Sequence, residues 1–285
     1  MDNPINLPDL NVVELLKSHG IQPDKRLGQN FLIDPMYLHR VADAGNITKD
    51  DTVLEVGAGL GSLTRLLGSQ AKEVFAVELD TDLIPILKQV TIQFSNIQII
   101  HRDILKIDPG ELTNSTSYLV VANIPYYITS NLIRHLLAGN TRPRRVVLTI
   151  QREVAERICA QPNKLSLLGL SVQVFGLPKI LSRVPAGAFY PVPKVDSAII
   201  RIEIYPAPII PADQLDIFFQ IAKAGFSQKR KMLRNSLSAG LRQDRSIIEN
   251  LLLEADIEPQ RRAQTLTLDE WKLLTSGYIK LGTQD

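Results

Sequence analysis

The chain reads Val53-Leu54-Glu55-Val56-Gly57-Ala58-Gly59-Leu60-Gly61 where a mainly apolar run meets three glycines spaced two apart. A short apolar run bounded by glycine is typical of a buried strand in a parallel sheet. Glycine after the strand lets the backbone turn into a helix and lets a ligand approach the main chain closely. The stretch therefore predicts a strand, a tight turn and a helix, with a ligand at the turn.

Further short apolar runs follow along the chain, separated by segments with helical spacing. The expected strands are 53–56, 74–77, 97–100, 118–121 and 146–150, and helices are expected at 81–93 and 129–138. Strands that alternate with helices form βαβ units and a mainly parallel sheet. We expect a Rossmann-like α/β domain, with two further strands at 171–175 and 198–204.

The composition changes at Pro206, Pro208 and Pro211, which disfavour helix and suit a linker. Beyond them the strand pattern stops, and apolar residues recur at helical spacing in 213–224, 230–239, 246–254 and 268–280. The sequence therefore predicts an α/β domain over residues 1–205 and a small all-helical domain over residues 206–285.

The overall composition sets broad limits on the class of protein. Of 285 residues, 45% are hydrophobic and 22% are charged, which are ordinary values for a folded chain. No apolar run approaches a membrane span, and no signal peptide is visible at the N-terminus. The single cysteine, Cys159, excludes an internal disulfide and fits a reducing compartment. We expect a cytoplasmic protein without a membrane partner and without a metal site.

Polar residues follow the predicted strands at the sheet edge where ligands bind in such folds. Ser62 replaces the last glycine of a dinucleotide fingerprint, and Glu78 follows Gly57 by about 20 residues, where an acid reaches a ribose. The combination suits an adenosine ligand without a pyrophosphate, so it favours S-adenosylmethionine over NAD. Asp103 can accept from the adenine amine or cap a helix.

The run Asn123-Ile124-Pro125-Tyr126 follows the fourth strand. The exocyclic amine of adenine is a poor nucleophile because its lone pair is delocalised into the ring. An asparagine oxygen and a backbone carbonyl can each accept one N–H and so free the lone pair. Proline fixes the backbone, and tyrosine offers a face for a splayed-out base. The motif predicts methyl transfer to an adenine, whereas an Asn-Pro turn with a packed tyrosine is the structural alternative.

With these motifs in order, the sequence resembles the ribosomal RNA adenine dimethyltransferases, and within them the bacterial small-subunit type. The resemblance covers nearly the whole chain and includes 28–32, 55–61, 77–80, 123–126, 151–157, 189–197 and 226–235. Residues 162–167 depart from the loop that bacterial members often carry, which puts contacts of that loop in doubt.

The resemblance implies a Rossmann-like S-adenosylmethionine-dependent enzyme that forms dimethyladenine at two adjacent adenosines near the 3′ end of small-subunit RNA. It implies a monomer acting on the assembling 30S particle. Cofactor binding is implied for Asn30, Leu32, Gly57, Gly59, Glu78, Asp103 and Asn123. Handling of the base is implied for Asn123, Pro125, Tyr126 and, as a second stacking face, Phe189.

Basic residues gather in the helical domain although the net charge is only +2. Clustered cations suit RNA phosphates, and a solvated helix face is the alternative. The residues expected to contact RNA are Lys223, Lys229, Arg230, Lys231 and Arg234.

Three other functions fit parts of the sequence. A large-subunit adenine methyltransferase that confers antibiotic resistance would share fold, cofactor and catalytic motif, but the segment 226–235 favours the small-subunit type. A non-catalytic RNA-binding or transcription factor would not need an intact 123–126 motif and glycine turn. A small-molecule methyltransferase would not need a basic helical domain.

Overall fold

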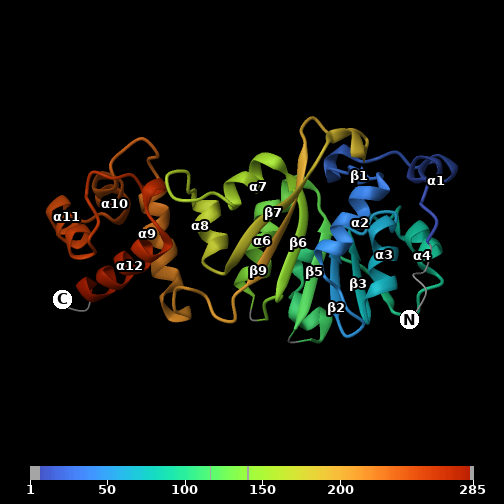
Figure 1. The fold of residues 1–285 in the computed structure, drawn as a ribbon, viewed down its shortest axis with the longest axis horizontal. Coiled ribbons are helices and arrows are strands. Elements are labelled where there is room, and N and C mark those ends of the chain that lie inside the picture. Colours follow the sequence, from blue (N-terminus) through green and yellow to red (C-terminus); the bar gives the residue numbers. More distant parts are fainter. Residues whose placement is uncertain (1–6, 116, 140, 283–285) are drawn as a thin grey trace. The chain divides into compact units, whose positions relative to one another are not determined.

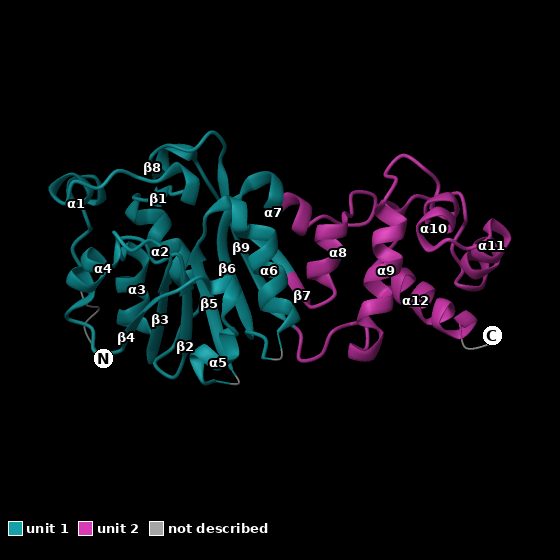
Figure 2. Ribbon diagram, turned by 180° about the vertical axis from the view of Figure 1, so that it is seen from behind, with its two compact units in different colours: residues 1–155, 178–204 teal, residues 156–177, 205–285 magenta. Residues whose placement is uncertain are grey.

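The computed structural model describes residues 7–115, 117–139 and 141–282 (Figure 1). The chain forms two compact units, which Figure 2 colours separately. One comprises Met1–Ala155 with Pro178–Ile204, and the other Glu156–Leu177 with Tyr205–Asp285. The second unit thus includes the segment 156–177, which the sequence assigned to the α/β domain. Within this segment the N–H groups of Asn163 and Leu165 donate to the Gln264 carbonyl rather than to the sheet.

The first unit is built on a seven-stranded sheet in the order β4-β3-β2-β5-β6-β9-β7. The first five strands in this order pair in parallel, and β9 runs antiparallel to β6. A mainly parallel sheet is therefore confirmed. The strands are β2 (Thr52–Val56), β3 (Glu73–Glu78), β4 (Ile97–His101), β5 (Tyr118–Asn123), β6 (Arg145–Gln151), β7 (Gly176–Val184) and β9 (Ser197–Ile204).

Helices pack on this sheet through buried aliphatic side chains. Val41 of α2 and Leu67 of α3 share one core cluster with Val53, Val121 and Val147 from three neighbouring strands. Helix α3 follows β2 along the chain and precedes β3, as a βαβ unit requires. The helices of this unit are α1 (Val12–Ser18), α2 (Pro35–Ala44), α3 (Ser62–Gln70), α4 (Ile84–Thr91), α5 (Pro109–Thr113), α6 (Thr129–Ala138) and the first residues of α7 (Arg152–Ile158).

The second unit is helical and packs around a buried tryptophan. The Trp271 side chain is fully buried, and its ring stacks on Phe226 with centroids 5.7 Å apart. Gly225 permits this approach, since a Cβ there would lie 2.7 Å from Trp271 Cη2. The helices are α8 (Leu167–Gln173), α9 (Leu215–Phe226), α10 (Leu233–Leu241), α11 (Arg245–Glu254) and α12 (Leu268–Gly282).

Two local expectations from the sequence are wrong. The segment 171–175, expected as a strand, belongs mostly to helix α8, whose first turn is capped by the Ser166 hydroxyl accepting from the Gly169 N–H at 3.1 Å. The helix expected at 230–239 begins only at Leu233, so Arg230 and Lys231 lie in the preceding turn. Within the described residues, no helix is both long and apolar enough to span a bilayer.

Candidate active site

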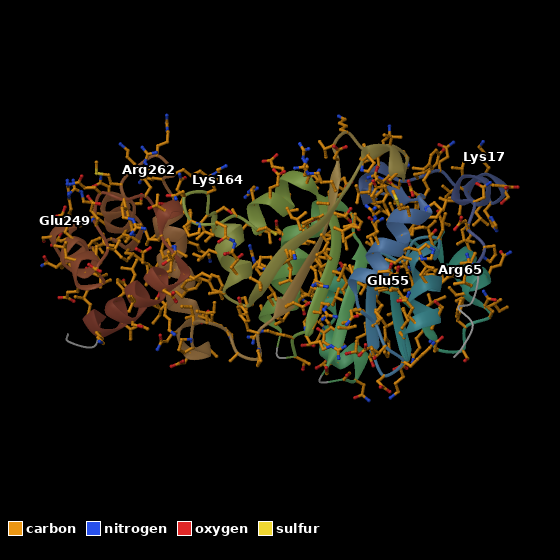
Figure 3. The ribbon with its side chains drawn as sticks, viewed as in Figure 1. Lys17, Glu55, Arg65, Lys164, Glu249 and Arg262 are labelled. Carbon is orange, nitrogen blue, oxygen red and sulfur yellow. The ribbon has the colours of Figure 1, made fainter. Side chains whose placement is uncertain are left out.

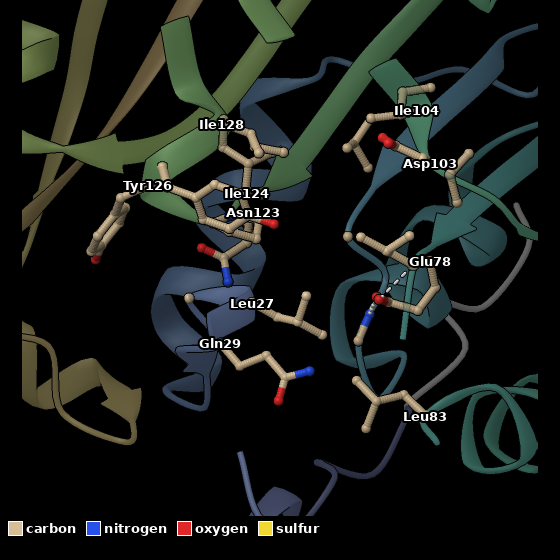
Figure 4. Close-up of a pocket in the computed structure, with 18 of the residues that line it drawn as sticks. Leu27, Gln29, Glu78, Leu83, Asp103, Ile104, Asn123, Ile124, Tyr126 and Ile128 are labelled. Carbon is tan, nitrogen blue, oxygen red and sulfur yellow. Dashed lines mark hydrogen bonds between the residues drawn. The ribbon is translucent and has the colours of Figure 1, made fainter. Parts of the chain in front are cut away.

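A pocket lies at the carboxyl ends of β2, β3 and β5, where the sequence placed its polar residues. Figure 4 shows Glu78 and Asp103 on one side of it and Asn123 and Tyr126 on the other. Part of the wall comes from the N-terminal segment 27–31, far away in the sequence. Of the predicted residues, those that line the pocket are Asn30, Gly57, Gly59, Glu78, Asp103, Asn123, Pro125 and Tyr126.

The glycine turn after β2 requires glycine for conformation and for space. Gly57 and Gly59 have φ of 73° and 58°, in the left-handed region that side chains disfavour. A Cβ on Gly59 would also lie 3.2 Å from Cε1 of Phe31. The Gly57 N–H donates to the Val77 carbonyl at 2.8 Å, which fixes the turn against the end of β3. The turn therefore presents bare main chain to the pocket.

Glu78 ends β3 and is nearly buried. Its Oε2 accepts from the Gly59 N–H at 2.7 Å, and its Oε1 accepts from the N–H groups of Leu79 and Asp80 at 2.7 and 2.8 Å. Burial raises the pKa of the Glu78 carboxyl, and these three N–H groups oppose that rise. Since a carboxylate offers about four lone-pair sites, one on Oε2 remains for a ligand hydroxyl.

Asp103 follows β4 and caps a helix, which is one of the two roles that the sequence allowed for it. Its Oδ1 accepts from the Leu105 N–H at 3.0 Å and so caps a short 3₁₀ helix, η2 (Ile104–Lys106). The carboxylate also lines the pocket. Capping occupies only Oδ1. The other oxygen, Oδ2, lies 3.9 Å from Lys106 Nζ and remains available to accept a hydrogen bond from a ligand.

Asn123 ends β5 and carries a buried hydrogen-bond acceptor that has no partner among the described residues. Its Nδ2 donates to the Asn30 carbonyl over 3.3 Å, and Asn30 Nδ2 in turn donates to the Gly28 carbonyl at 3.1 Å. The Asn123 Oδ1 makes no hydrogen bond. A buried acceptor left unpaired costs free energy unless a ligand satisfies it. The hydrogen bond from Nδ2 to Asn30 identifies the nitrogen, so the other amide atom, of a residue that lines the pocket, is the unpaired oxygen.

The residues after Asn123 form a rigid turn. Pro125 has φ of −58°, and its carbonyl accepts from the Ile128 N–H at 3.3 Å. The Ile124 carbonyl accepts no hydrogen bond from any described residue. Tyr126 begins the 3₁₀ helix η3 (Tyr126–Ile128), and its hydroxyl lies 2.6 Å from Ser197 Oγ. Burial raises the pKa of this phenol, so it stays protonated at neutral pH.

Two predicted residues lie outside the pocket. Leu32 and Phe189 pair with each other on the short strands β1 (Phe31–Leu32) and β8 (Phe189–Tyr190), and both side chains are buried in the main core cluster. The ring of Phe189, at 1% exposure, presents no face to the pocket. Their roles in cofactor and base binding stay predictions.

The structure also adds pocket residues that the sequence alone did not single out. Tyr127 and Gln29 both line the pocket, and Gln29 Nε2 donates to Asp80 Oδ2 at 2.5 Å. Gln29 lies within the motif segment 28–32 and Tyr127 directly follows the segment 123–126, which is the signal that could have identified them. Among the described residues, no group of three or more metal-ligating side chains gathers.

The basic residues of the helical unit differ in their surroundings. Lys223 is exposed on α9, and the side chains of Lys229, Arg230 and Lys231 are exposed in the turn before α10. Arg234 differs, because its Nη1 lies 2.6 Å from Glu249 Oε1. Figure 3 shows Glu249 on this unit, together with Lys164 and Arg262 on loops. Four of the five predicted cations are therefore exposed.

Comparisons with known proteins identify a family and relatives that match nearly the whole chain. The family model described as ribosomal RNA adenine dimethylase matches residues 21–273. A protein named ribosomal RNA small subunit methyltransferase A from Dehalococcoides mccartyi is 43% identical, over 94% of this chain and 92% of its own. A protein of the same name from Clostridium botulinum is 40% identical, over 93% of this chain and 98% of its own.

Solved structures share the fold. A dimethyladenosine transferase from Plasmodium falciparum has a TM-score of 0.76 and 25% identity, with 87% of this chain and 97% of that chain covered. The 23S rRNA methyltransferase ErmE has a TM-score of 0.72 and 27% identity, with 87% and 99% covered.

Proposed function

This chain belongs to the ribosomal RNA adenine dimethylase family, and we propose that it methylates the N6 amines of two adjacent adenosines near the 3′ end of small-subunit rRNA. The relatives with 43% and 40% identity carry small-subunit names and match the chain over nearly its full length. The product of two transfers to each amine is N6,N6-dimethyladenosine.

The residues around the glycine turn fit S-adenosylmethionine as the cofactor. The main chain at Gly57 and Gly59 has positive φ and carries no side chains, so it leaves room for a ligand beside the turn. Glu78 offers its remaining lone pair to a ribose hydroxyl, and Asp103 offers Oδ2 to the adenine amine. When bound, S-adenosylmethionine supplies a methyl group activated on a positively charged sulfur.

The single observation that carries the proposal is the unpaired acceptor of Asn123. Its Oδ1 can accept one N–H of the target amine, and the Ile124 carbonyl can accept the other. Together they draw the nitrogen toward a tetrahedral shape and release its lone pair from the ring. Preorganised polar groups of this kind act without reorganising during the reaction.

Tyr126 is suited to hold the base while Asn123 acts on the amine. Its hydroxyl is tied to Ser197, so the ring keeps one orientation. Stacking on an aromatic face stabilises a base outside a helix by about 1–3 kcal/mol. Among the described residues, no histidine lines the pocket, and the proton of the methylated amine can leave to water. The reaction therefore rests on positioning and hydrogen bonding.

The exposed cations of the helical unit are proposed to contact RNA phosphates, which position a substrate without reading its sequence. Lys223, Lys229, Arg230 and Lys231 present exposed positive charge for this purpose. We also propose that the chain acts as a monomer on the assembling 30S particle in the cytoplasm.

The decisive test follows labelled methyl from S-adenosylmethionine into purified ribosomal particles. Small-subunit particles that lack the modification should accept about four methyl groups each, two on each of two adenosines. Fully modified small subunits serve as the control and should accept none. Labelling of large-subunit RNA instead would assign the chain to the large-subunit class, and no labelling of either would favour a non-catalytic RNA-binding role.

A further inference from the structure

Tyr127 is an exposed aromatic side chain at the rim of the pocket. Its side chain is 57% exposed, which makes it the most exposed aromatic in the part of the chain that the structure describes. An aromatic ring offers a large apolar face, and because this one is exposed where it lines the pocket, the face is available to cover a ligand. The neighbouring Tyr126 is half-buried and tied to Ser197, so the two adjacent tyrosines have different environments.

The ring of Tyr127 lies against the main chain of the N-terminal segment. A Cβ built on Gly28 would lie 3.1 Å from Tyr127 Cδ1 and 3.4 Å from its Cε1. Gly28 has φ of 63°, and its carbonyl accepts from the Asn30 amide. Because Asn123 is bonded to Asn30, the ring rests on the same segment that positions Asn123.

Tyr127 lines the same pocket as Glu78 and Asp103. Partial burial, followed by the negative charges of Asp103 and Glu78, raises the pKa of Tyr127. The corresponding charge acting on Tyr126 is that of Asp196, near Ser197 and away from those acids. The Tyr127 hydroxyl itself makes no hydrogen bond to any described residue. The ring is therefore held in place by packing and not by its hydroxyl.

We propose that Tyr127 covers the cofactor side of the pocket and controls the rate at which the cofactor leaves. The assignment rests on the proposed use of S-adenosylmethionine and adds a residue that acts on cofactor exchange. The ring packs on Gly28 and lines the pocket together with Glu78 and Asp103, which are the residues proposed to hold the adenosine part. Since each dimethyladenosine needs two transfers, the spent cofactor must leave between them, and a rim residue acts on that step.

The test measures dissociation of radiolabelled S-adenosylmethionine from the full chain, by rapid filtration after dilution into unlabelled cofactor. Tyr127→Ala should release cofactor about tenfold faster, because the apolar cover is removed and affinity changes are mostly changes in dissociation rate. Tyr127→Phe keeps the ring and should stay within about twofold of the wild type. The matched control is Ile92→Ala, an exposed apolar side chain outside the pocket, which should behave as the wild type.

The outcomes separate this inference from the proposed function. If the wild-type chain bound no cofactor, both the role of Tyr127 and the proposed function would be wrong. Cofactor binding by the wild type, with release from Tyr127→Ala at the wild-type rate, would overturn the role of Tyr127 and leave the proposed function standing. A Phe variant as fast as the Ala variant would also overturn it, since the ring would then contribute nothing. A raised KM for RNA with unchanged cofactor release would assign the ring to the target base instead.

Discussion

Arg234 on α10 and Glu249 on α11 form an ion pair, with Nη1 and Oε1 2.6 Å apart, and both side chains are largely covered. Arg245 approaches the same carboxylate oxygen at 3.4 Å. The charge of Arg234 is therefore neutralised within the helical unit, whereas Arg230 in the preceding turn is exposed. Two cations that are close in sequence have different physical roles.

We predict that Arg230→Glu and Arg234→Glu have different consequences. Arg230→Glu should weaken RNA binding and reduce the slope of log affinity against log salt by about 0.7–0.9 for each phosphate that the protein no longer neutralises. Arg234→Glu places like charges together and should destabilise the fold by roughly 1–3 kcal/mol. Salt titrations of RNA binding and thermal unfolding distinguish them. An unchanged salt slope for Arg230→Glu would show that the exposed turn at 229–231 does not contact RNA phosphates.

The strands of the sheet could be predicted from sequence because their signals are local. The runs at 53–56 and 118–121 fall within β2 and β5, since apolar segments bounded by polar residues have few other uses in an α/β fold. The run at 171–175 was misassigned, because a short apolar segment fits a buried helix equally well. Strand β7 was missed because the exposed positions Leu177 and Leu181 are apolar, which hides the alternation of the strand, and because it contains Pro178.

The site was only partly visible in sequence. Glu78, Asp103 and Asn123 follow strand ends, and parallel topology alone brings strand ends together. The participation of Asn30 depends on a segment that meets the sheet over a separation of 93 residues, and the resemblance, not the pattern, supplied it. Phe189 is buried where its strand pairs with that of Leu32, and no pattern in the sequence around either residue predicts this pairing. The periodicity of apolar residues predicts local elements and cannot predict which distant segments pair with each other.

Glu78→Ala should weaken cofactor binding by roughly 2–4 kcal/mol. In the proposed site the carboxylate binds a ribose hydroxyl, and in the structure it accepts from the Gly59 N–H, so its removal should affect both the ribose contact and the glycine turn. Calorimetry with S-adenosylmethionine measures the effect. Asp82→Ala, an exposed acid close by, is the control and should bind normally. Unchanged affinity in a folded Glu78→Ala variant would remove Glu78 from the site.

Glu55 should make the protein less stable as pH rises. Burial raises the pKa of this carboxyl to about 8, and the nearby Glu78 charge adds to the rise. The folded chain retains a proton that the unfolded chain releases, so stability present below pH 4.5 is lost as the pH approaches 8. Glu55→Gln imitates the protonated acid and should remove a decline of about 1.4 kcal/mol per pH unit.

Urea unfolding of wild type and Glu55→Gln at several pH values measures this difference. The two stability curves should converge at acid pH and separate progressively toward pH 8. Curves that remain parallel throughout would mean that Glu55 is ionised in the folded protein. Lys49→Gln, at an exposed surface position, controls for general charge effects.

The last prediction concerns Asn123 and the order of activities at the 123–126 motif. Asn123→Ala should lower the single-turnover rate by about 10²–10³-fold, as for single oxyanion-hole donors, because the buried Oδ1 is removed. RNA affinity should remain nearly unchanged, since it derives from many phosphate contacts. Tyr126→Phe removes only the bond to Ser197 and should keep much of the activity, whereas Tyr126→Ala should abolish most of it. Because Asn123 lines the pocket proposed for the cofactor, Asn123→Ala should also bind cofactor more weakly. Measuring the rate at saturating RNA and cofactor separates the chemical step from this loss of affinity. An Asn123→Ala variant that turned over like the wild type would make the unpaired oxygen a structural feature and would remove the hydrogen-bonding mechanism.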